Sequence, residues 1–372
     1  MSELIPITVA SVILALLSHH YSQYDYLHER YVSKERLFFG IMAVAMILFV
    51  GLRTDYNDTA MYRLIYEAIP KNPSLTAGID WLKIGENPGF VFTNRLLVRL
   101  DFSAQSYLMF YAVLTIGIYL WFLRKYTCHL PLTIFLFVTF SGYTFTLAAI
   151  KQCFAMALCL VATDRAIHRK FLPFIFWVLL GALYHPYALM YLVVPFLMFR
   201  PWSFKTVIML VAFATAGFIL ESLIGSIVDV TDLLGENYDA SSFTGEGVNP
   251  FRVAAVSVPV FMALIARTVI AQKRDRVQNL MVNLAMLNAE IMFVGLFGTA
   301  NYFARLANYF LPFQALAMPW LFTHFEKKSR QFVTHCAVIC YLLFFVYSNA
   351  IHESFDHQFY YVTLWKYLRS LF

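Results

Sequence analysis

Long apolar runs recur along the whole chain, and many of them reach about 20 residues, the length of helix that crosses the hydrocarbon core of a bilayer. Of the 372 residues, 60% are hydrophobic and only 13% are charged. A soluble domain carries about 25% charged residues. A water-soluble protein is therefore excluded, and so is a soluble domain on a single anchor. The sequence predicts an all-α, polytopic membrane protein.

The apolar runs divide into twelve predicted transmembrane spans within a single integral membrane domain, residues 1–372. Their approximate limits are 4–20, 36–52, 104–122, 130–149, 152–167, 171–185, 187–200, 204–224, 253–271, 278–298, 303–323 and 331–349. The sixth and seventh are separated only by His185-Pro186. Because proline kinks or ends a helix, residues 171–199 form either two elements or one kinked element.

The distribution of basic residues predicts the orientation, because Lys and Arg in short loops stay in the cytoplasm. Most of the 28 Lys and Arg residues lie in the loops that follow odd-numbered spans. These loops are expected to face the cytoplasm, so both termini are expected outside. The start of the chain, Ser2-Glu3, lacks the positive charge of a signal peptide.

Two of the outward segments are long enough to be functional. In residues 53–103 a polar cap followed by proline, Glu86-Asn87-Pro88, reads as a helix start. We expect short interfacial or re-entrant helices there, with Arg95 and Arg99 on one face. Residues 225–252 are acidic and rich in Gly and Ser, and they lack the spacing of a calcium-binding loop. This second segment is interpreted as a solvated acidic loop, with a mobile lid as the alternative.

Polar and ionisable groups gather at the outward ends of the spans. Such groups are costly at membrane depth, so each is a candidate functional residue. They come from five separate junctions: Arg53 and Asp55, Glu86, Lys151 and Gln152, His185, and Arg305. An active site that faces outward would be assembled from several loops in this manner.

Each of these groups also has a plainer interpretation. Arg53 either binds phosphate oxygens as a fork or is neutralised by Asp55 at the lipid headgroups. His185 has a pKa suited to proton transfer, yet a lone histidine is more often a capping or interfacial residue. Lys151 lies on the outward side, against the general trend of the basic residues, and therefore requires a counter-anion.

The segment TANYFARLANYFLPF places several polar groups on one helical face. Asn301, Arg305 and Asn308 share that face through the i, i+4, i+7 spacing, and Tyr302 and Tyr309 flank it. Arg305 alone would be explained by snorkelling toward the headgroups. The two asparagines gain nothing from lipid, so the face favours a contact with a phosphate or a sugar.

Other features separate the remaining classes of function. Glu290 lies inside the tenth span, where a carboxyl group marks an ion path or is hydrogen-bonded within the bundle. The five cysteines contain no CxxC pair, so neither a zinc site nor a disulfide framework is indicated. The motifs of nucleotide, zinc and serine hydrolase chemistry are absent as well. No cofactor, metal or nucleic acid is expected, because arginines and a lysine can neutralise an anionic lipid substrate.

The order of these motifs resembles the EpsG-type family of bacterial exopolysaccharide polymerases, related in role to the Wzy polymerases. GLRTDYNDTAMY is similar to the family's Arg, Asp and Tyr after the second span, and ENPGF to its Glu-x-Pro-Gly-aromatic element. IKQCFAMAL resembles its Arg-Gln-x-x-Ala element, with Lys151 in place of arginine. GALYHPYAL resembles its Phe-His-x-Ser-Ala element, with Tyr184 and Pro186 as departures, and the span with Arg305 resembles a late Arg and aromatic stretch. Together these motifs cover most of residues 40–320.

The resemblance implies an enzyme of the bacterial plasma membrane, with a GT-C-like architecture, that polymerises oligosaccharide repeat units carried on undecaprenyl diphosphate at the outer face. Arg53, Lys151 and Arg305 would hold the diphosphate, and Glu86, Asp55 or His185 would accept the proton of the attacking sugar hydroxyl. Glu86 is slightly preferred as that base. Further substrate contacts are expected from Tyr62, Gln152, Asn301, Tyr302 and Asn308. Partners would be membrane lipid, a chain-length co-polymerase and a flippase.

Three other functions compete with this interpretation. A transporter or flippase for a lipid-linked sugar would place charge near the midplane and have related halves. An O-antigen ligase would use the same arginines with a different acceptor. A non-catalytic scaffold would tolerate the loss of Arg53, Glu86 and Arg305.

Overall fold

The computed structural model describes residues 3–21, 23–25, 30–32, 35–233, 247–273, 275–298, 300–352 and 359–370. Nearly all of the elements in this part are helical. The first half contains α1 (Leu4–His20), β1 (Gln23–Asp25), β2 (Arg30–Val32), α2 (Leu37–Gly51), β3 (Arg53–Asp55), α3 (Thr59–Glu67), the 3-10 helix η1 (Ile84–Glu86), α4 (Pro88–Arg99), α5 (Ala104–Tyr126), α6 (Leu130–Thr139), α7 (Gly142–Ala148), α8 (Ile150–Ile167) and α9 (Phe171–Ala182).

The second half begins with a 3-10 helix and ends with a short strand and helix. It contains η2 (Pro186–Leu197), α10 (Phe204–Leu233), α11 (Pro250–Ile265), α12 (Arg267–Lys273), α13 (Arg276–Val294), α14 (Ala300–Asn308), α15 (Leu311–Phe322), α16 (Lys327–Val346), the π-helix η4 (Tyr347–His352), β4 (Tyr360–Tyr361) and α17 (Leu364–Arg369). The strands form two antiparallel pairs, β1 with β2 and β3 with β4.

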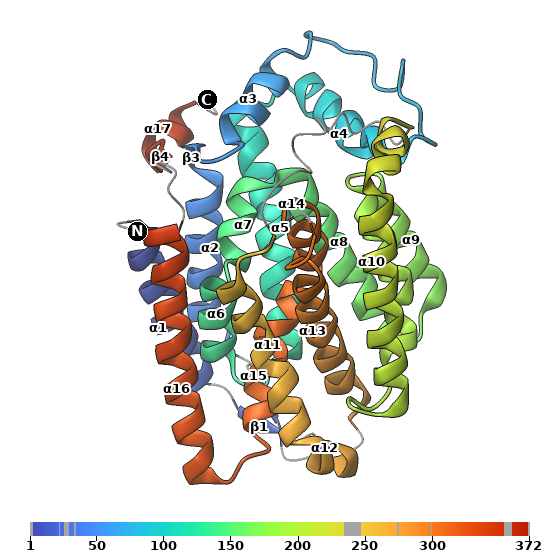
Figure 1. Ribbon diagram of the computed structural model, residues 1–372. Coiled ribbons are helices and arrows are strands. Elements are labelled where there is room, and N and C mark those ends of the chain that lie inside the picture. Colours follow the sequence, from blue (N-terminus) through green and yellow to red (C-terminus); the bar gives the residue numbers. More distant parts are fainter. Residues whose placement is uncertain are drawn as a thin grey trace.

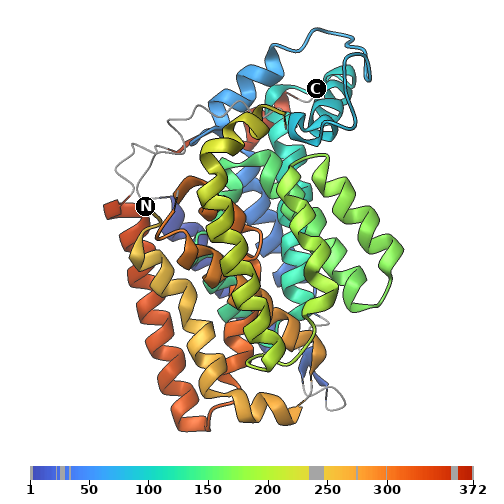
Figure 2. The ribbon, with the colours of Figure 1, turned by 45° about the vertical axis from the view of Figure 1, so that its right-hand side comes forward.

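The long helices form a bundle whose two ends differ (Figures 1 and 2). Neighbours in sequence pack together from α1 to α2 and from α8 to α9, and α5 packs on both α2 and α8. A second group is formed by α11, α13 and α15. At one end α3 and α4 lie across the bundle, with the C-terminal α17 beside them, and at the other end lie α12 and β1 (Figure 1). Residues 53–103, the longer of the two segments predicted to face outward, thus lie at the α3–α4 end.

Several of the helices are apolar enough to cross a membrane. Within the described residues, three pass on length and composition: α5, α13 and residues 327–350. Two bent pairs, α6 with α7 at 49° and α11 with α12 at 69°, raise the number to as many as 5. Each of the twelve predicted spans coincides with a helix or a helix pair. Most of those helices, however, are too short to be identified as membrane-spanning by length. The chain is a multi-pass, all-α membrane protein, and twelve spans stay a prediction.

The sequence left one connection open and misjudged one boundary. Residues 171–199 form two elements, α9 and η2, because the chain is extended at His185 and Pro186 opens the second element. The helix α10 continues to Leu233, beyond the predicted end at 224, so residues 225–233 are helical and not part of a loop. Apolar residues at 223, 224, 227 and 228 keep the helical spacing. The rest of the predicted acidic loop, up to residue 246, lies outside the described residues.

The helix predicted at Asn87-Pro88 is confirmed. Asn87 adopts a left-handed conformation with φ 54°, and Pro88 is the first residue of α4. Gly89 then allows a close approach to the turn after α9, because its N–H donates to the Leu183 carbonyl at 2.8 Å. A Cβ atom on Gly89 would lie 2.9 Å from Leu183 Cβ. This contact fixes α4 against the turn that carries His185.

Beneath α3 and α4 lies an apolar cluster that is separate from the main core and rich in tyrosine. Its buried members are Tyr62, Tyr66, Phe90, Leu97, Ala104, Tyr107, Leu108, Tyr111, Ile150, Phe154, Ala155, Leu158 and Tyr184. They come from the α3–α4 segment and from α5, α8 and the end of α9. The cluster anchors the outer helices on the bundle, which gives the groups at this end a fixed geometry.

Candidate functional site

Two basic residues, a histidine and a tyrosine from four separate segments lie together at the α3–α4 end. Tyr62 of α3 interacts electrostatically with Arg305 of α14 and hydrogen-bonds with the backbone of Lys151 in α8. His185, between α9 and η2, interacts electrostatically with both Lys151 and Arg305. The structure therefore brings together Tyr62, Lys151, His185 and Arg305, all of which the sequence analysis names as candidate site residues.

Lys151 is placed in this group by the start of α8. The helix begins at Ile150 after a sharp break at Ala149, so Lys151 lies in its first turn. The first N–H groups of a helix have no partner within the helix and carry a partial positive charge. The N-terminus of α8 thus adds positive potential next to Tyr62, and the charge of Lys151 acts on His185.

His185 is held by its backbone and by its ring. The side chain is 1% exposed, and the backbone N–H donates to the Gly181 carbonyl at 3.0 Å. Its Nδ1 atom lies 3.0 Å from the hydroxyl of Tyr309. The carbonyl of Tyr309 in turn accepts a hydrogen bond of 2.5 Å from the Tyr191 hydroxyl. This chain of contacts fixes the orientation of the imidazole ring.

The polar face of α14 is bonded to its neighbours. The Gln152 side chain donates from Nε2 to the Arg305 carbonyl at 2.8 Å. Asn308, at the end of α14, accepts a hydrogen bond of 3.1 Å from Arg252. The ring of Tyr302 meets that of Tyr187 edge to face, with centroids 5.7 Å apart. The side chain of Asn301 lies outside the described part of the chain.

Arg53 lies deeper than the other basic residues. Its side chain is 1% exposed, and Nε donates to the Thr59 hydroxyl at 3.0 Å while the guanidinium also donates to the Val50 carbonyl. Arg53 and Asp55 form no ion pair within the described residues. Burial lowers the pKa of Arg53 to about 10, so it keeps its charge at neutral pH.

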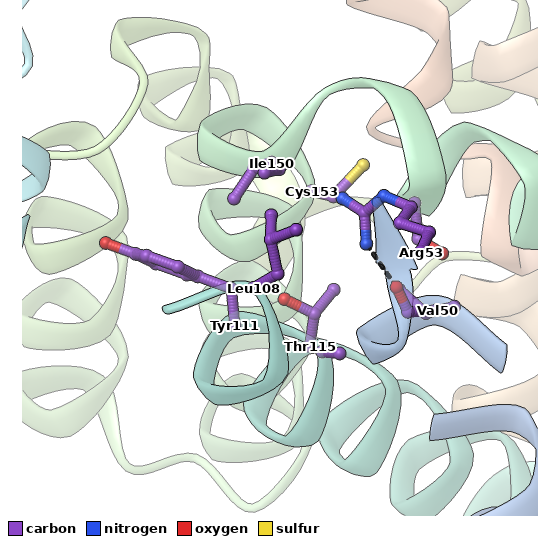
Figure 3. A pocket seen from close by; sticks show the side chains of 9 residues that line it. Val50, Arg53, Leu108, Tyr111, Thr115, Ile150 and Cys153 are labelled. Atoms are coloured by element: carbon purple, nitrogen blue, oxygen red, sulfur yellow. Dashed lines mark hydrogen bonds between the residues drawn. The ribbon is translucent and has the colours of Figure 1, made fainter. Parts of the chain in front are cut away.

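A small pocket lies next to Arg53, between α2, α5 and α8 (Figure 3). Its lining includes the polar side chains of Tyr111, Thr115, Thr146 and Cys153. The room that it leaves for the centres of water-sized molecules is about 10 Å³. This is about what one water molecule needs, so the pocket is much too small for a sugar or a diphosphate.

The two acidic candidates are not among the charged groups that act on His185. Asp55 is in β3, where it pairs across the strands with Tyr360 of β4. Glu86 is exposed, and its carboxylate forms an ion pair of 3.3 Å with Lys83, three residues earlier. An i, i+3 pair of this kind is what a surface turn provides by itself.

Three contacts of the site were not foreseen. Tyr187 lies against the ring of His185, with centroids 4.7 Å apart, and Thr59 receives the hydrogen bond of Arg53. The contact of Arg252 with Asn308 was not expected either. Tyr187 follows His185 by two residues, and in an irregular turn this spacing does not predict a contact between the two rings. Only the fold brings Arg252 to α14.

Comparison with known proteins identifies the family. Searches of curated proteins and of solved structures return no match. The model of the EpsG family matches residues 36–364, most of the chain and all of the segments that form the site. The chain therefore belongs to the EpsG family.

Proposed function

We propose that this protein polymerises oligosaccharide repeat units carried on undecaprenyl diphosphate at the outer face of the bacterial plasma membrane. Membership of the EpsG family supports a polysaccharide polymerase. The observation that carries the proposal is the meeting of Lys151 and Arg305 at His185, next to Tyr62 of α3. A lipid diphosphate and a sugar hydroxyl are the two groups that such a site suits.

The basic residues would act on the leaving group. In the reaction, an oxygen of the acceptor sugar attacks the anomeric carbon of the donor chain, and the bond from that carbon to the diphosphate breaks. The electron pair goes to undecaprenyl diphosphate, whose charge increases as the bond breaks. Lys151, Arg305 and the N-terminus of α8 are arranged to stabilise that charge.

His185 is our choice for the group that accepts the proton of the attacking hydroxyl. In this role Nδ1 carries a proton and donates to the Tyr309 oxygen, which leaves Nε2 to accept. Asp55 and Glu86 are less suited, since one lies in β3 and the other forms a surface pair with Lys83. The proton thus moves from the acceptor hydroxyl to Nε2 and later to solvent.

Complementation tests the proposal. Wild type, Arg305→Ala and Lys151→Ala are expressed in a strain that lacks the chromosomal copy, and the surface polysaccharide is separated on a gel. Arg99→Ala is the matched control, because Arg99 lies on α4 at the same end of the bundle and is exposed. We expect a polymer ladder from wild type and from Arg99→Ala, and single repeat units at the surface from the two site variants at equal membrane abundance.

The location of the repeat units separates the competing functions. Single units that accumulate inside cells lacking the protein indicate a flippase. Polymer that forms normally but is not transferred to its final acceptor indicates a ligase. A ladder from both Arg305→Ala and Lys151→Ala would remove the two basic residues from the reaction.

A further inference from the structure

A short segment near the C-terminus is bound to the loop that carries Arg53. Residues 359–363, here called the C-terminal strap, contain β4, which pairs antiparallel with β3 so that Tyr361 lies opposite Arg53. The N–H of Val362 donates to the Leu52 carbonyl at 3.0 Å. The strap thus adds a strand along the backbone that joins α2 to α3, at a distance of some 300 residues in sequence (Figure 1).

Aromatic stacking strengthens this attachment. The ring of Phe359 stacks on that of Tyr56, with centroids 4.4 Å apart and planes 13° apart. Phe49, in the last turns of α2, contacts the rings of both Phe359 and Tyr361 at 5.9 and 5.2 Å. Stacked aromatic pairs contribute energy beyond the area that they bury. The strap is therefore held by its side chains as well as by its backbone.

The strap reaches the site through Arg53 and Thr59. The ring of Tyr56 stacks on that of Phe359, and its backbone carbonyl accepts a hydrogen bond of 2.7 Å from the Thr59 hydroxyl. The same hydroxyl accepts a hydrogen bond of 3.0 Å from Arg53 Nε. Thr59 is the first residue of α3, the helix that carries Tyr62. Since Tyr62 lies one turn further along, the position of Thr59 sets that of the Tyr62 hydroxyl against Lys151 and Arg305.

The remaining contacts of Arg53 also connect it to the helices around the site. Its guanidinium donates to the Val50 carbonyl at the end of α2, and the pocket beside it has room for about one water molecule. Gln105 of α5 binds the carbonyl of Arg53 at 3.1 Å and that of Gly51 at 2.7 Å. Arg53 therefore joins α2, α5 and α3 at the point that the strap covers.

We propose that Arg53 and the C-terminal strap are positioning elements of the active site, which hold α3 so that Tyr62 stays in register with Lys151 and Arg305. This inference rests on the proposed polymerase function. It assigns Arg53 a role through Thr59 and α3, in place of direct contact with the diphosphate. A strap that only stabilised the fold would affect abundance and would act independently of Tyr62.

The test combines strap variants with Tyr62→Phe. Phe359→Ala, Phe359→Tyr and Trp365→Ala are made in the wild-type and the Tyr62→Phe background, and polymerisation rates are measured in membranes with lipid-linked repeat units at saturating concentration. Trp365 lies in α17 beyond the strap and is exposed, so Trp365→Ala is the matched aromatic control. Rates are divided by the amount of protein in each membrane preparation.

We expect Phe359→Ala to lower the rate roughly tenfold to a hundredfold, as small misplacements in active sites do. Phe359→Tyr keeps the ring and should keep the rate, and Trp365→Ala should match wild type. In the Tyr62→Phe background, Phe359→Ala should add less than about a twofold loss, because both changes act on the same hydroxyl.

Other results overturn the inference. A wild-type rate for Phe359→Ala, or losses that multiply in the double variant, would mean that the strap does not act through Tyr62. Should Phe359→Ala fail to accumulate, Phe359→Leu replaces it, and equal rates for Phe359→Leu and Phe359→Tyr would equally contradict the role of the stacked ring. A wild-type protein that makes no polymer would instead overturn the proposed function itself.

Discussion

The Gln152 side chain donates a hydrogen bond of 2.8 Å to the backbone carbonyl of Arg305, more than 150 residues away in sequence. Gln152 is 2% exposed and follows Lys151 in the first turn of α8. The bond therefore ties the helix that carries one basic residue of the site to the helix that carries the other.

Gln152→Leu should lower polymerisation about tenfold while both basic residues remain. Leucine has a similar size but cannot donate, so the part-buried Arg305 carbonyl loses this partner, at a cost of about 1 kcal/mol. The rate of polymer formation per amount of membrane protein measures the effect. Gln278→Leu, which alters a glutamine of α13 that donates to the Tyr126 carbonyl at 3.4 Å, shows whether the loss is specific to α14. A Gln152→Leu variant with the wild-type rate would mean that α14 is positioned by other contacts.

His185→Gln should remove the acid limb of the pH–rate profile. A histidine that accepts a proton must be neutral, so the wild-type rate should fall as the pH is lowered and His185 becomes protonated. Glutamine does not titrate, and the residual rate should be at least about a hundredfold lower and independent of pH in that range. Initial rates in membranes across the acidic and neutral range give both profiles. An unchanged acid limb in His185→Gln would assign the base to another group.

Much of this arrangement could be predicted from the sequence, because it depends on local patterns. The apolar runs coincide with the helices, and Asn87-Pro88 opens α4 as expected. Basic residues at the outward ends of the spans indicated a site, since charge at that depth needs a reason. Lys151, His185 and Arg305 are indicated in this way, whereas Tyr62 is expected as a substrate contact from the family resemblance.

The remaining features depend on contacts between distant segments. The burial of Arg53 under β4 requires the pairing of β3 with residues near the C-terminus, and strands of two or three residues have no recognisable sequence period. The role of Glu86 as the base stays a prediction, and its carboxylate is exposed and pairs with Lys83 three residues earlier. The lengths of the helices also escaped prediction, because breaks such as the 49° bend between α6 and α7 lie inside apolar runs.

Asp164→Ala should destabilise the protein without affecting the chemistry. Asp164 is 1% exposed and is bound by Lys125, by the Tyr126 hydroxyl at 2.7 Å and by Arg165 at 3.6 Å. It lies on α8 thirteen residues beyond Lys151, about 20 Å along the helix axis. Removing it leaves a half-exposed lysine and a buried hydroxyl without their acceptor.

We expect Asp164→Ala to lower the free energy of unfolding by about 1–3 kcal/mol, a value reduced by the solvent exposure of Lys125 and Arg165. Thermal unfolding in detergent gives the stability, and the rate per folded molecule gives the activity. Asp164→Asn keeps one acceptor oxygen for Tyr126, so its stability should lie between those of wild type and Asp164→Ala. A rate per folded molecule that drops together with stability would show that this end of α8 is coupled to the site.

Gly89→Ala should disturb the site through backbone packing. The added Cβ would lie 2.9 Å from Leu183 Cβ and 3.1 Å from the Leu183 carbonyl, so α4 must move away from the turn before His185. Overpacking of this kind costs about 1–3 kcal/mol. Gly117→Ala is the control, since Gly117 lies inside α5 with nothing within 4 Å of the new Cβ, and alanine favours a helix by up to about 1 kcal/mol. We therefore expect Gly89→Ala to lower both the unfolding temperature and the polymerisation rate. Gly117→Ala should leave the rate unchanged and keep or raise the unfolding temperature. Full activity in Gly89→Ala would mean that His185 keeps its place without the contact between α4 and Leu183.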